Sequence, residues 1–277
     1  MIFARDGSGD TTKSIGTRAE ATETSKVFKG GQRQSTALKI KDNNRKRSDV
    51  TPASKMVQIP YTRKMPGQKR HSTAKVVALL NRYGCPIPFH AVRARFMGSI
   101  VSPVPDSSPV HAIHELWGGK FPPFDRMDDL NDLLHVLMDS LWNRLTAHQT
   151  ATKSFKLTPV QIKPTREGGH HYALVRKQEI EGFLDGLFGP HEEMDLPETA
   201  HNGLEALGQI RAMLAGAIDL LDDTGKPAPP DELKGLAENL QALEPIMEQE
   251  MNAVILSCTR ARRQLLAETR LSKPTVH

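Results

Sequence analysis

The chain has 277 residues and a mass of 30.7 kDa, enough for one sizeable domain or two small ones. Its only two cysteines, Cys85 and Cys258, lie far apart, which excludes a disulfide framework and a cysteine zinc site and favours a reducing cytoplasm. No apolar run approaches the roughly 18 residues that cross a bilayer, and the N-terminus lacks the apolar core of a secretory signal. We therefore expect a cytoplasmic protein with no membrane partner.

Positive charge is concentrated at the N-terminal end. The overall net charge is +5, but residues 1–75 hold 17 basic and 6 acidic residues, whereas the remainder holds 20 basic and 26 acidic ones. Up to residue 71 small and polar residues predominate without hydrophobic periodicity, so this segment cannot bury enough apolar surface to offset its ordering entropy. We predict a disordered basic tail over residues 1–71 and a folded part over residues 72–277.

The tail also predicts a partner. A flexible, strongly basic chain binds polyanions by counterion release, without sequence preference. We therefore expect contact with nucleic acid, the ribosome or an acidic protein; the alternative is a solubilising or spurious extension. The predicted contact residues are Arg45, Lys46, Arg47, Arg63, Lys64, Lys69 and Arg70.

The first predicted helices follow the tail directly. Ser72 or Thr73 can cap a helix over residues 74–83, which a glycine ends. Pro88 suits the first turn of a second helix over residues 89–100, which ends before Ser102-Pro103. A short third helix begins after Ser107 or Ser108 and stops at a pair of glycines, residues 118–119.

The strongest helical pattern covers residues 127–148. Acidic residues crowd its first turn, where the helix dipole favours them. Leucines repeat at spacings of four, three, four and four residues, as on one face of a helix: Leu130, Leu134, Leu137, Leu141 and Leu145.

Residues 150–173 have no helical pattern and predict an ordered crossing loop or extended segment. Four apolar side chains could hold it to the core: Phe155, Leu157, Val160 and Ile162. Further helices are predicted over residues 174–188, 201–221 and 230–270, the last broken or kinked at Pro245. Without strand-like alternation, the class is all-α, a helical bundle-like domain, with a possible division into residues 72–150 and 172–270.

The pattern H-x-x-H-E in the short third helix is the clearest candidate for a metal site. His111 and His114 stand three residues apart and could share an ion, with Glu115 as a third ligand. The zinc-peptidase patterns H-E-x-x-H and H-x-x-E-H are absent. In a regular helix the side chain of Glu115 would also project about 100° away from that of His114 around the helix axis. We therefore favour polar helix-end residues over a metal site and expect no cofactor. Further ligands could come from His90, His135, His148, Glu181 or Asp185.

Other reactive residues show no recognised arrangement. His170-His171 and His191-Glu-Glu193 adjoin glycine or proline, which favours solvated loop residues over metal ligands. Cys85 and Cys258 lack a neighbouring histidine that would mark a nucleophile, so burial as small apolar residues is favoured. The phosphate-binding, nucleophile-elbow and dinucleotide motifs are absent.

The order of elements over residues 89–148 resembles the YecA/YgfB-like family of bacterial helical proteins. The resemblance rests on Gly98-Ser-Ile-Val-Ser-Pro103, Leu116-Trp-Gly-Gly119 and Leu141-Trp-Asn143, with a weaker echo in Glu181-Gly-Phe-Leu-Asp-Gly-Leu187. It implies an all-α, cytoplasmic bacterial protein and no assigned reaction. The zinc knuckle at the C-terminus of many longer members is missing, so the ribosome or secretion links seen through it do not carry over.

Together these patterns favour a non-enzymatic interaction module. In this reading the tail attaches to nucleic acid, the ribosome or an acidic partner, and four side chains build the core or its rim: Leu116, Trp117, Leu141 and Trp142. The rival hypothesis is a metal-dependent hydrolase that uses His111, His114 and Glu115. Sequence alone leaves the oligomeric state open.

Overall fold

The structure, a computed structural model, describes residues 72–104, 108–191, 194–225 and 228–271. The predicted tail and its seven basic contact residues lie outside these ranges. All the described residues belong to one compact unit. Within the described ranges, no helix is long and apolar enough to span a membrane.

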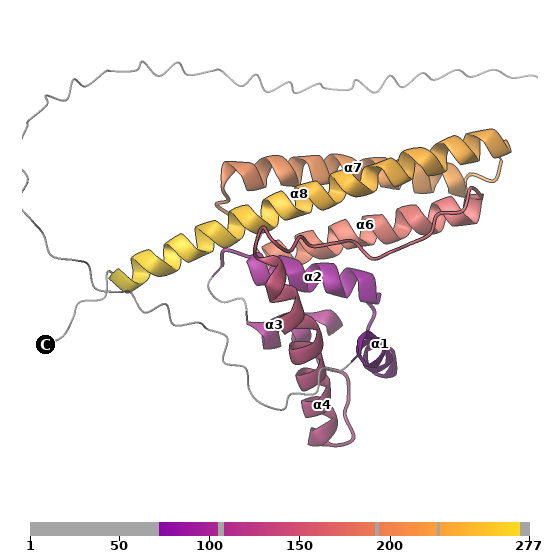
Figure 1. The fold of residues 1–277 in the computed structure, drawn as a ribbon. Coiled ribbons are helices and arrows are strands. Elements are labelled where there is room, and N and C mark those ends of the chain that lie inside the picture. Colours follow the sequence, from indigo (N-terminus) through magenta and orange to yellow (C-terminus); the bar gives the residue numbers. More distant parts are fainter. Residues whose placement is uncertain (1–71, 105–107, 192–193, 226–227, 272–277) are drawn as a thin grey trace, which may run out of the picture. The chain divides into compact units, whose positions relative to one another are not determined.

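The described part is helical and contains no strand, as predicted (Figure 1). Three long helices dominate it: α6 (Arg166–Phe188), α7 (Glu198–Asp222) and α8 (Pro230–Leu271). The shorter elements precede them in the chain. They are α1 (Thr73–Arg82), α2 (Phe89–Val101), α3 (Pro109–His114), the 3₁₀ turn η1 (Glu115–Trp117), α4 (Met127–Leu137), the π-helical turn η2 (Met138–Trp142), α5 (Asn143–Leu145) and the 3₁₀ turn η3 (Thr146–His148).

The long helices α6, α7 and α8 pack side by side as an antiparallel bundle (Figure 1). Short connections join consecutive helices and thus reverse the chain direction. Apolar side chains at helical spacing fill the interior, among them Phe183 of α6, Leu207 and Leu214 of α7, and Val254 of α8, each fully buried. This burial orders a bundle whose helices would be marginal in isolation.

The most extensive helix–helix contact joins α2 to α6. At three positions a glycine of one helix faces the backbone of the other. A Cβ atom on Gly98, Gly182 or Gly186 would lie closer than 3.0 Å to a carbonyl oxygen of the facing helix, which belongs to Phe183, Ala91 and Arg95 respectively. Ala91 and Arg95 oppose Gly182 and Gly186 in the same order, so the two helices run parallel with their backbones nearly in contact.

The elements α1, α3 and α4 gather on the side of α2 away from α7 and α8 (Figure 1). Leu116, Leu141 and Trp142 are buried, and Trp142 packs edge-on against Phe96 of α2 with ring centroids 5.6 Å apart. Trp117 lies at the rim, where its indole Nε1 donates a hydrogen bond to the carbonyl of Tyr83 over 2.9 Å. The four residues thus build the core and its rim, as expected.

Residues 149–165 connect the first helices to α6 as an extended segment, as predicted. Phe155 and Leu157 are buried, while Val160 and Ile162 are partly buried against the same core. Side chains of α8 and α6 form the backbone hydrogen bonds that a neighbouring strand would form in a sheet. Asn252 pairs with both backbone groups of Phe155 over 2.7 and 2.9 Å, and Glu248 accepts from the Leu157 N–H over 3.0 Å.

A buried arginine completes this attachment. Arg176 of α6 is 1% exposed and donates to Glu179 over 2.7 Å, to the Thr158 carbonyl over 2.8 Å and to Glu244 of α8. Burial alone lowers the pKa of Arg176, but hydrogen bonding with Tyr172 and the charge of Glu179 outweigh it and raise that pKa. The ion pairs therefore hold Arg176 charged inside the core, where it joins α6, α8 and the extended segment.

The predicted start of α6 was wrong. The helix begins at Arg166 rather than residue 174, because Thr165 caps it by accepting from the Gly168 N–H over 3.0 Å. The glycines had suggested a loop, yet a Cβ at Gly168 would lie closer than 3.0 Å to the carbonyl oxygen of Lys163. Close packing at the first helical turn, and not flexibility, accounts for Gly168. His170 and His171 consequently lie on a helix and not in a loop.

Two other boundaries differ from the sequence prediction. The prediction for the last helix was a break or a kink at Pro245; α8 is continuous through that residue, so it is not broken there. A proline removes one backbone hydrogen bond, but the buried side chains of Leu240 and Met247 pack on both sides of it. The predicted helix over residues 127–148 is one helical run, but it widens into a π-helical turn over Met138–Trp142 and tightens to 3₁₀ at its end.

We expect Gly186→Ala to lower the free energy of unfolding by about 3 kcal/mol, because its Cβ would meet the backbone of Arg95. The control is Gly208→Ala in α7, where no atom lies within 4 Å of the added Cβ. Removing a helical glycine there should raise stability by about 0.5–1 kcal/mol. Chemical denaturation of both variants measures the difference; equal stabilities would contradict the close contact.

Tyr172 should make stability depend on alkaline pH. Burial raises the pKa of Tyr172, Arg176 lowers it, and the hydrogen bond to Glu244 raises it. The net result is an increase from 10.0 to about 12. The folded state thus favours the protonated phenol, and this contribution, on the order of 2 kcal/mol, is complete below pH 10 and is lost between pH 10 and 12. The ultraviolet absorbance difference between wild type and Tyr172→Phe should titrate near pH 12; a midpoint near 10 in the folded protein would refute it.

Candidate functional sites

The histidine cluster, defined as His111, His114 and Glu115, lies where α3 passes into η1. Pro109 occupies the first turn of α3, and the Ser108 side chain caps it by accepting from the His111 N–H over 3.1 Å. Ile113 and Leu116 are fully buried and hold the turn on the core. The opposite face, which carries the cluster, therefore points outward.

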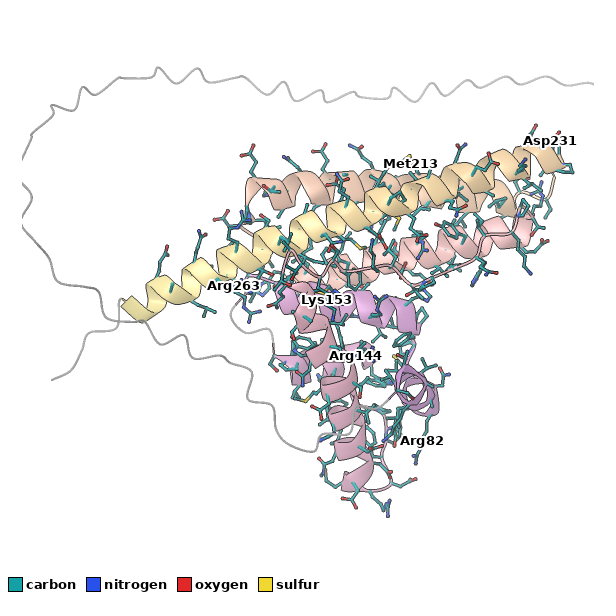
Figure 2. The ribbon with its side chains drawn as sticks, viewed as in Figure 1. Arg82, Arg144, Lys153, Met213, Asp231 and Arg263 are labelled. Carbon is teal, nitrogen blue, oxygen red and sulfur yellow. The ribbon has the colours of Figure 1, made fainter. Side chains whose placement is uncertain are left out.

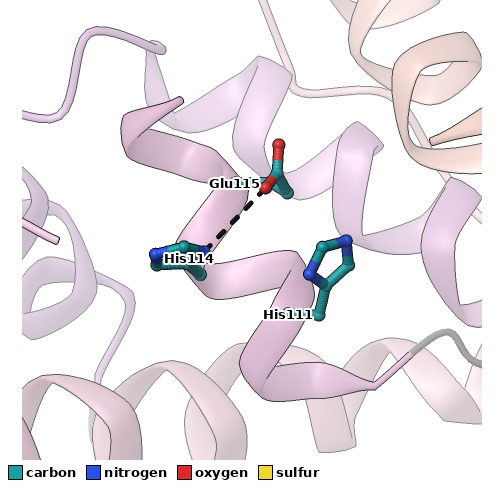
Figure 3. A group of neighbouring side chains, drawn as sticks. All are labelled: His111, His114 and Glu115. Atoms are coloured by element: carbon teal, nitrogen blue, oxygen red, sulfur yellow. Dashed lines mark ion pairs between the residues drawn. The ribbon is translucent and has the colours of Figure 1, made fainter. Parts of the chain in front are cut away.

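The three side chains of the histidine cluster converge (Figure 3). One potential ligand atom from each residue lies within 4.8 Å of the other two. Although the helix directs Glu115 away from His114, its flexible side chain reaches back, so that its Oε1 lies 3.9 Å from His114 Nδ1. His111 is exposed, and His114 and Glu115 are half-buried.

The chain following η1 shapes the surroundings of this cluster. Gly118 and Gly119 have positive φ angles of 66° and 78°, which an L-residue adopts only under strain. A Cβ on Gly119 would lie 3.4 Å from Glu115 Oε1, so the glycine also leaves space beside the carboxylate. Phe121 then packs on the His114 ring with centroids 4.8 Å apart and limits its orientations.

A pocket of about 370 Å³ opens beside the cluster, between α2, α3 and the end of α6. His111 and Glu115 line it, together with Arg95, Asp185 and His191. Asp185, one of the further ligands considered from the sequence, therefore shares a pocket with the cluster, and so does His191, for which the sequence favoured a solvated loop position.

The other candidates lie elsewhere and have partners. His90 hydrogen-bonds Gln178 over 2.8 Å, and Glu181 pairs with Lys177 over 2.8 Å. His135 and Asp139 lie 3.0 Å apart on successive turns of one helical run. His170 lies 3.3 Å from Asp222, and His171 is exposed.

The surroundings of both cysteines are those of residues that pack in the core. Cys258 is fully buried in α8, and burial raises the pKa of its thiol to about 11. Burial also raises the pKa of Cys85, whose thiol donates to the carbonyl of Ile87 over 3.5 Å. Thiols in such surroundings remain protonated and are poor nucleophiles.

A second candidate site, which we call the basic surface, is formed by Arg93, Arg144, His148, Lys153, Arg262 and Arg263. Its first part surrounds η3. Burial lowers the pKa of Arg93, with Glu179 and Glu248 opposing and the positive charge of Arg144 contributing. Burial likewise lowers the pKa of His148, and the charges of Lys153 and Arg93 add to that effect. Arg93 and His148 also contact the same Phe155 ring, and His148 Nδ1 donates to the Lys153 carbonyl over 3.1 Å. With its lowered pKa, His148 adds a hydrogen-bonding group rather than a positive charge at neutral pH.

The remaining members of the basic surface come from the far end of α8. Arg262 and Arg263 line a pocket of about 360 Å³ together with Thr146 and Gln149, which lie beside Arg144 and His148 in the chain. Arg262 donates to the Ile100 carbonyl over 2.9 Å, which fixes the position of its guanidinium. Arg144, Lys153 and Arg263 are exposed, and Figure 2 labels them.

Sequence reasoning missed this surface because its members are scattered between residues 93 and 263. Only one short stretch of the folded part resembles the runs of basic residues in the tail. A signal was present in Arg260-Ala-Arg-Arg263, but its neighbours become apparent only once α8 crosses the end of α2.

The chain matches no protein-family model, no curated protein and no solved structure. The resemblance of residues 89–148 to YecA/YgfB-like proteins therefore stays a prediction.

Proposed function

We propose that this protein is a non-enzymatic interaction module that contacts the phosphate backbone of nucleic acid. The observation that carries the proposal is the basic surface, because it adds a positioned cluster of charge to the basic tail expected from the sequence. Phosphate contacts from arginine and lysine supply most non-specific affinity for nucleic acid. We further propose a cytoplasmic location and an origin in the YecA/YgfB-like family.

The composition of the basic surface supports this role. Arginine forms fork-like hydrogen bonds with phosphate, while lysine offers a mobile point charge. Thr146 and Gln149 provide neutral hydrogen-bonding groups between the two basic parts. A surface that binds a nucleic-acid strand through its phosphate backbone uses such a mixture of charged and polar groups, and it needs no pocket for a base.

The basic surface is also anchored. Arg93 donates to the Lys156 carbonyl and lies over the Phe155 ring at 4.7 Å, so its charge is held in place by the extended segment. His148 Nδ1 donates to the carbonyl of Ser154 over 2.9 Å. The exposed Arg144 and Lys153 thus stand on a fixed support and lose little freedom beyond their own side chains on binding.

The convergence of His111, His114 and Glu115 favours a second candidate function, a metal-dependent hydrolase. Two histidines and a carboxylate form a ligand set known from catalytic zinc sites. This function ranks second because all three residues would be ligands, and hydrolysis needs in addition a base and a substrate site.

Neutralising the tail should weaken binding and its dependence on salt. In the tail variant Arg45, Lys46, Arg47, Arg63, Lys64, Lys69 and Arg70 are replaced by glutamine. Each lost phosphate contact lowers the slope of log affinity against log salt by about 0.9 on duplex DNA. Fluorescence anisotropy of a labelled duplex in a salt series measures the slope; an unchanged slope would exclude these residues as contacts.

The basic surface can be tested within the full chain. The variant Arg144→Gln, Lys153→Gln, Arg263→Gln should lower affinity and reduce the salt slope by up to about 2.7, since each contact contributes about 0.9. A charge-matched control replaces three exposed basic residues elsewhere, Lys120, Arg211 and Lys234. If both variants lose the same affinity, only net charge matters and the basic surface is not the contact; if neither binds less than wild type, the surface is also excluded.

A further inference from the structure

We propose that His111, His114 and Glu115 bind one divalent first-row transition metal ion, with Zn²⁺ as the representative case, at the rim of the pocket between α2, α3 and α6. This site is independent of the proposed nucleic-acid contact. It is, however, a precondition for the hydrolase ranked second, so its failure would remove that function and leave the first intact.

The distances within the cluster suit such an ion. Zinc lies about 2.0–2.2 Å from histidine nitrogen and carboxylate oxygen, so two ligand atoms around a tetrahedral ion are separated by roughly 3.4 Å. The three ligand atoms already lie within 4.8 Å of one another, and Oε1 of Glu115 is 3.9 Å from Nδ1 of His114. Small side-chain rotations close the remaining gap without moving the backbone.

The backbone beneath the site is held from both sides. The Ser108 cap and the buried Ile113 and Leu116 fix the turn on the core. Phe121 limits the orientations of the His114 ring, and Gly119 leaves space next to Glu115. A ligand set on a fixed turn loses little conformational freedom when the ion binds.

The chemistry of the donors selects the class of ion. Two imidazoles and one carboxylate favour zinc and its neighbours, whereas magnesium and calcium prefer sites made of oxygen atoms. The single carboxylate leaves a complex of net positive charge. Because His111 and Glu115 also line the pocket, open coordination positions face it, and Arg95 in the same lining favours an anionic ligand there.

Titration calorimetry of the metal-free, full-length protein with Zn²⁺ tests the proposal. We expect one ion per chain at this site and at least about a 100-fold loss of affinity in the double variant His111→Ala, His114→Ala, since even indirect partners of metal ligands contribute 10–100-fold. Glu115→Gln keeps the side-chain shape but removes its charge and should also weaken binding. The visible absorption of Co²⁺, used in place of zinc, reports the coordination geometry of each variant.

Two controls make the outcome decisive. His201→Ala removes an exposed histidine of α7. The double variant His170→Ala, His171→Ala removes two consecutive histidines of α6 that lie outside the cluster. Both control variants should keep wild-type affinity for Zn²⁺. Circular dichroism verifies that each variant is folded. Absence of Zn²⁺ binding by the wild type, equal binding by the His111/His114 double variant, or loss in the His170/His171 pair instead would each overturn the proposal.

Discussion

The near contact of two backbones, α2 against α6, is the constraint on which the rest of the fold depends. Glycines at positions 98, 182 and 186 let the two parallel helices approach until the Cα of one faces the carbonyl of the other. Such closeness permits weak Cα–H···O bonds between the helices. It also brings together two backbones that larger side chains would hold apart. The helices α7 and α8 cover one side of this pair and α1, α3 and α4 the other. The pocket beside the histidine cluster depends on this contact, because Arg95 and Gly186 of the two facing backbones line it.

A buried charge network reinforces the same centre. Breaking one partner of a buried ion pair costs more than the intact pair contributes, because the remaining charge stays desolvated. Arg176 and Glu179 are each 1% exposed, and together they also satisfy the backbone of Thr158. The network thus specifies where the extended segment lies, even though apolar residues of similar size could supply as much stability. That position in turn sets Arg93 and Lys153 within the basic surface.

Much of this architecture could be predicted from the sequence, and the failures have physical reasons. The helix over residues 127–148 was recognised from its leucine repeat and the first three from their capping residues, glycines and prolines, while the extended segment was recognised where helical patterns stop. The start of α6 was missed because Gly168 and Gly169 usually mark loops, whereas here neighbours at Lys163 and Leu221 leave no room for a larger side chain. Pro245 suggested a break or a kink, and the buried Leu240 and Met247 near it help keep the helix unbroken. The histidine cluster was visible as residues, but its convergence depends on how far a glutamate side chain reaches back. The basic surface depends on contacts across more than a hundred residues, and its only local signal is Arg260-Ala-Arg-Arg263.

The hydrogen bonds between Phe155 and Asn252 affect how the chain folds during its synthesis on the ribosome. These partners lie 97 residues apart, and Ile100 and Arg262 lie 162 apart. A ribosome releases the chain from the N-terminus, so α2 and the extended segment emerge long before α8 can cover them. During that interval the backbone of Phe155 lacks the side chain of Asn252 that pairs with it in the folded protein. The packing of α8 on the extended segment can therefore be completed only after residue 252 has been synthesised, and nascent chains that stop short of it would present surfaces that chaperones bind.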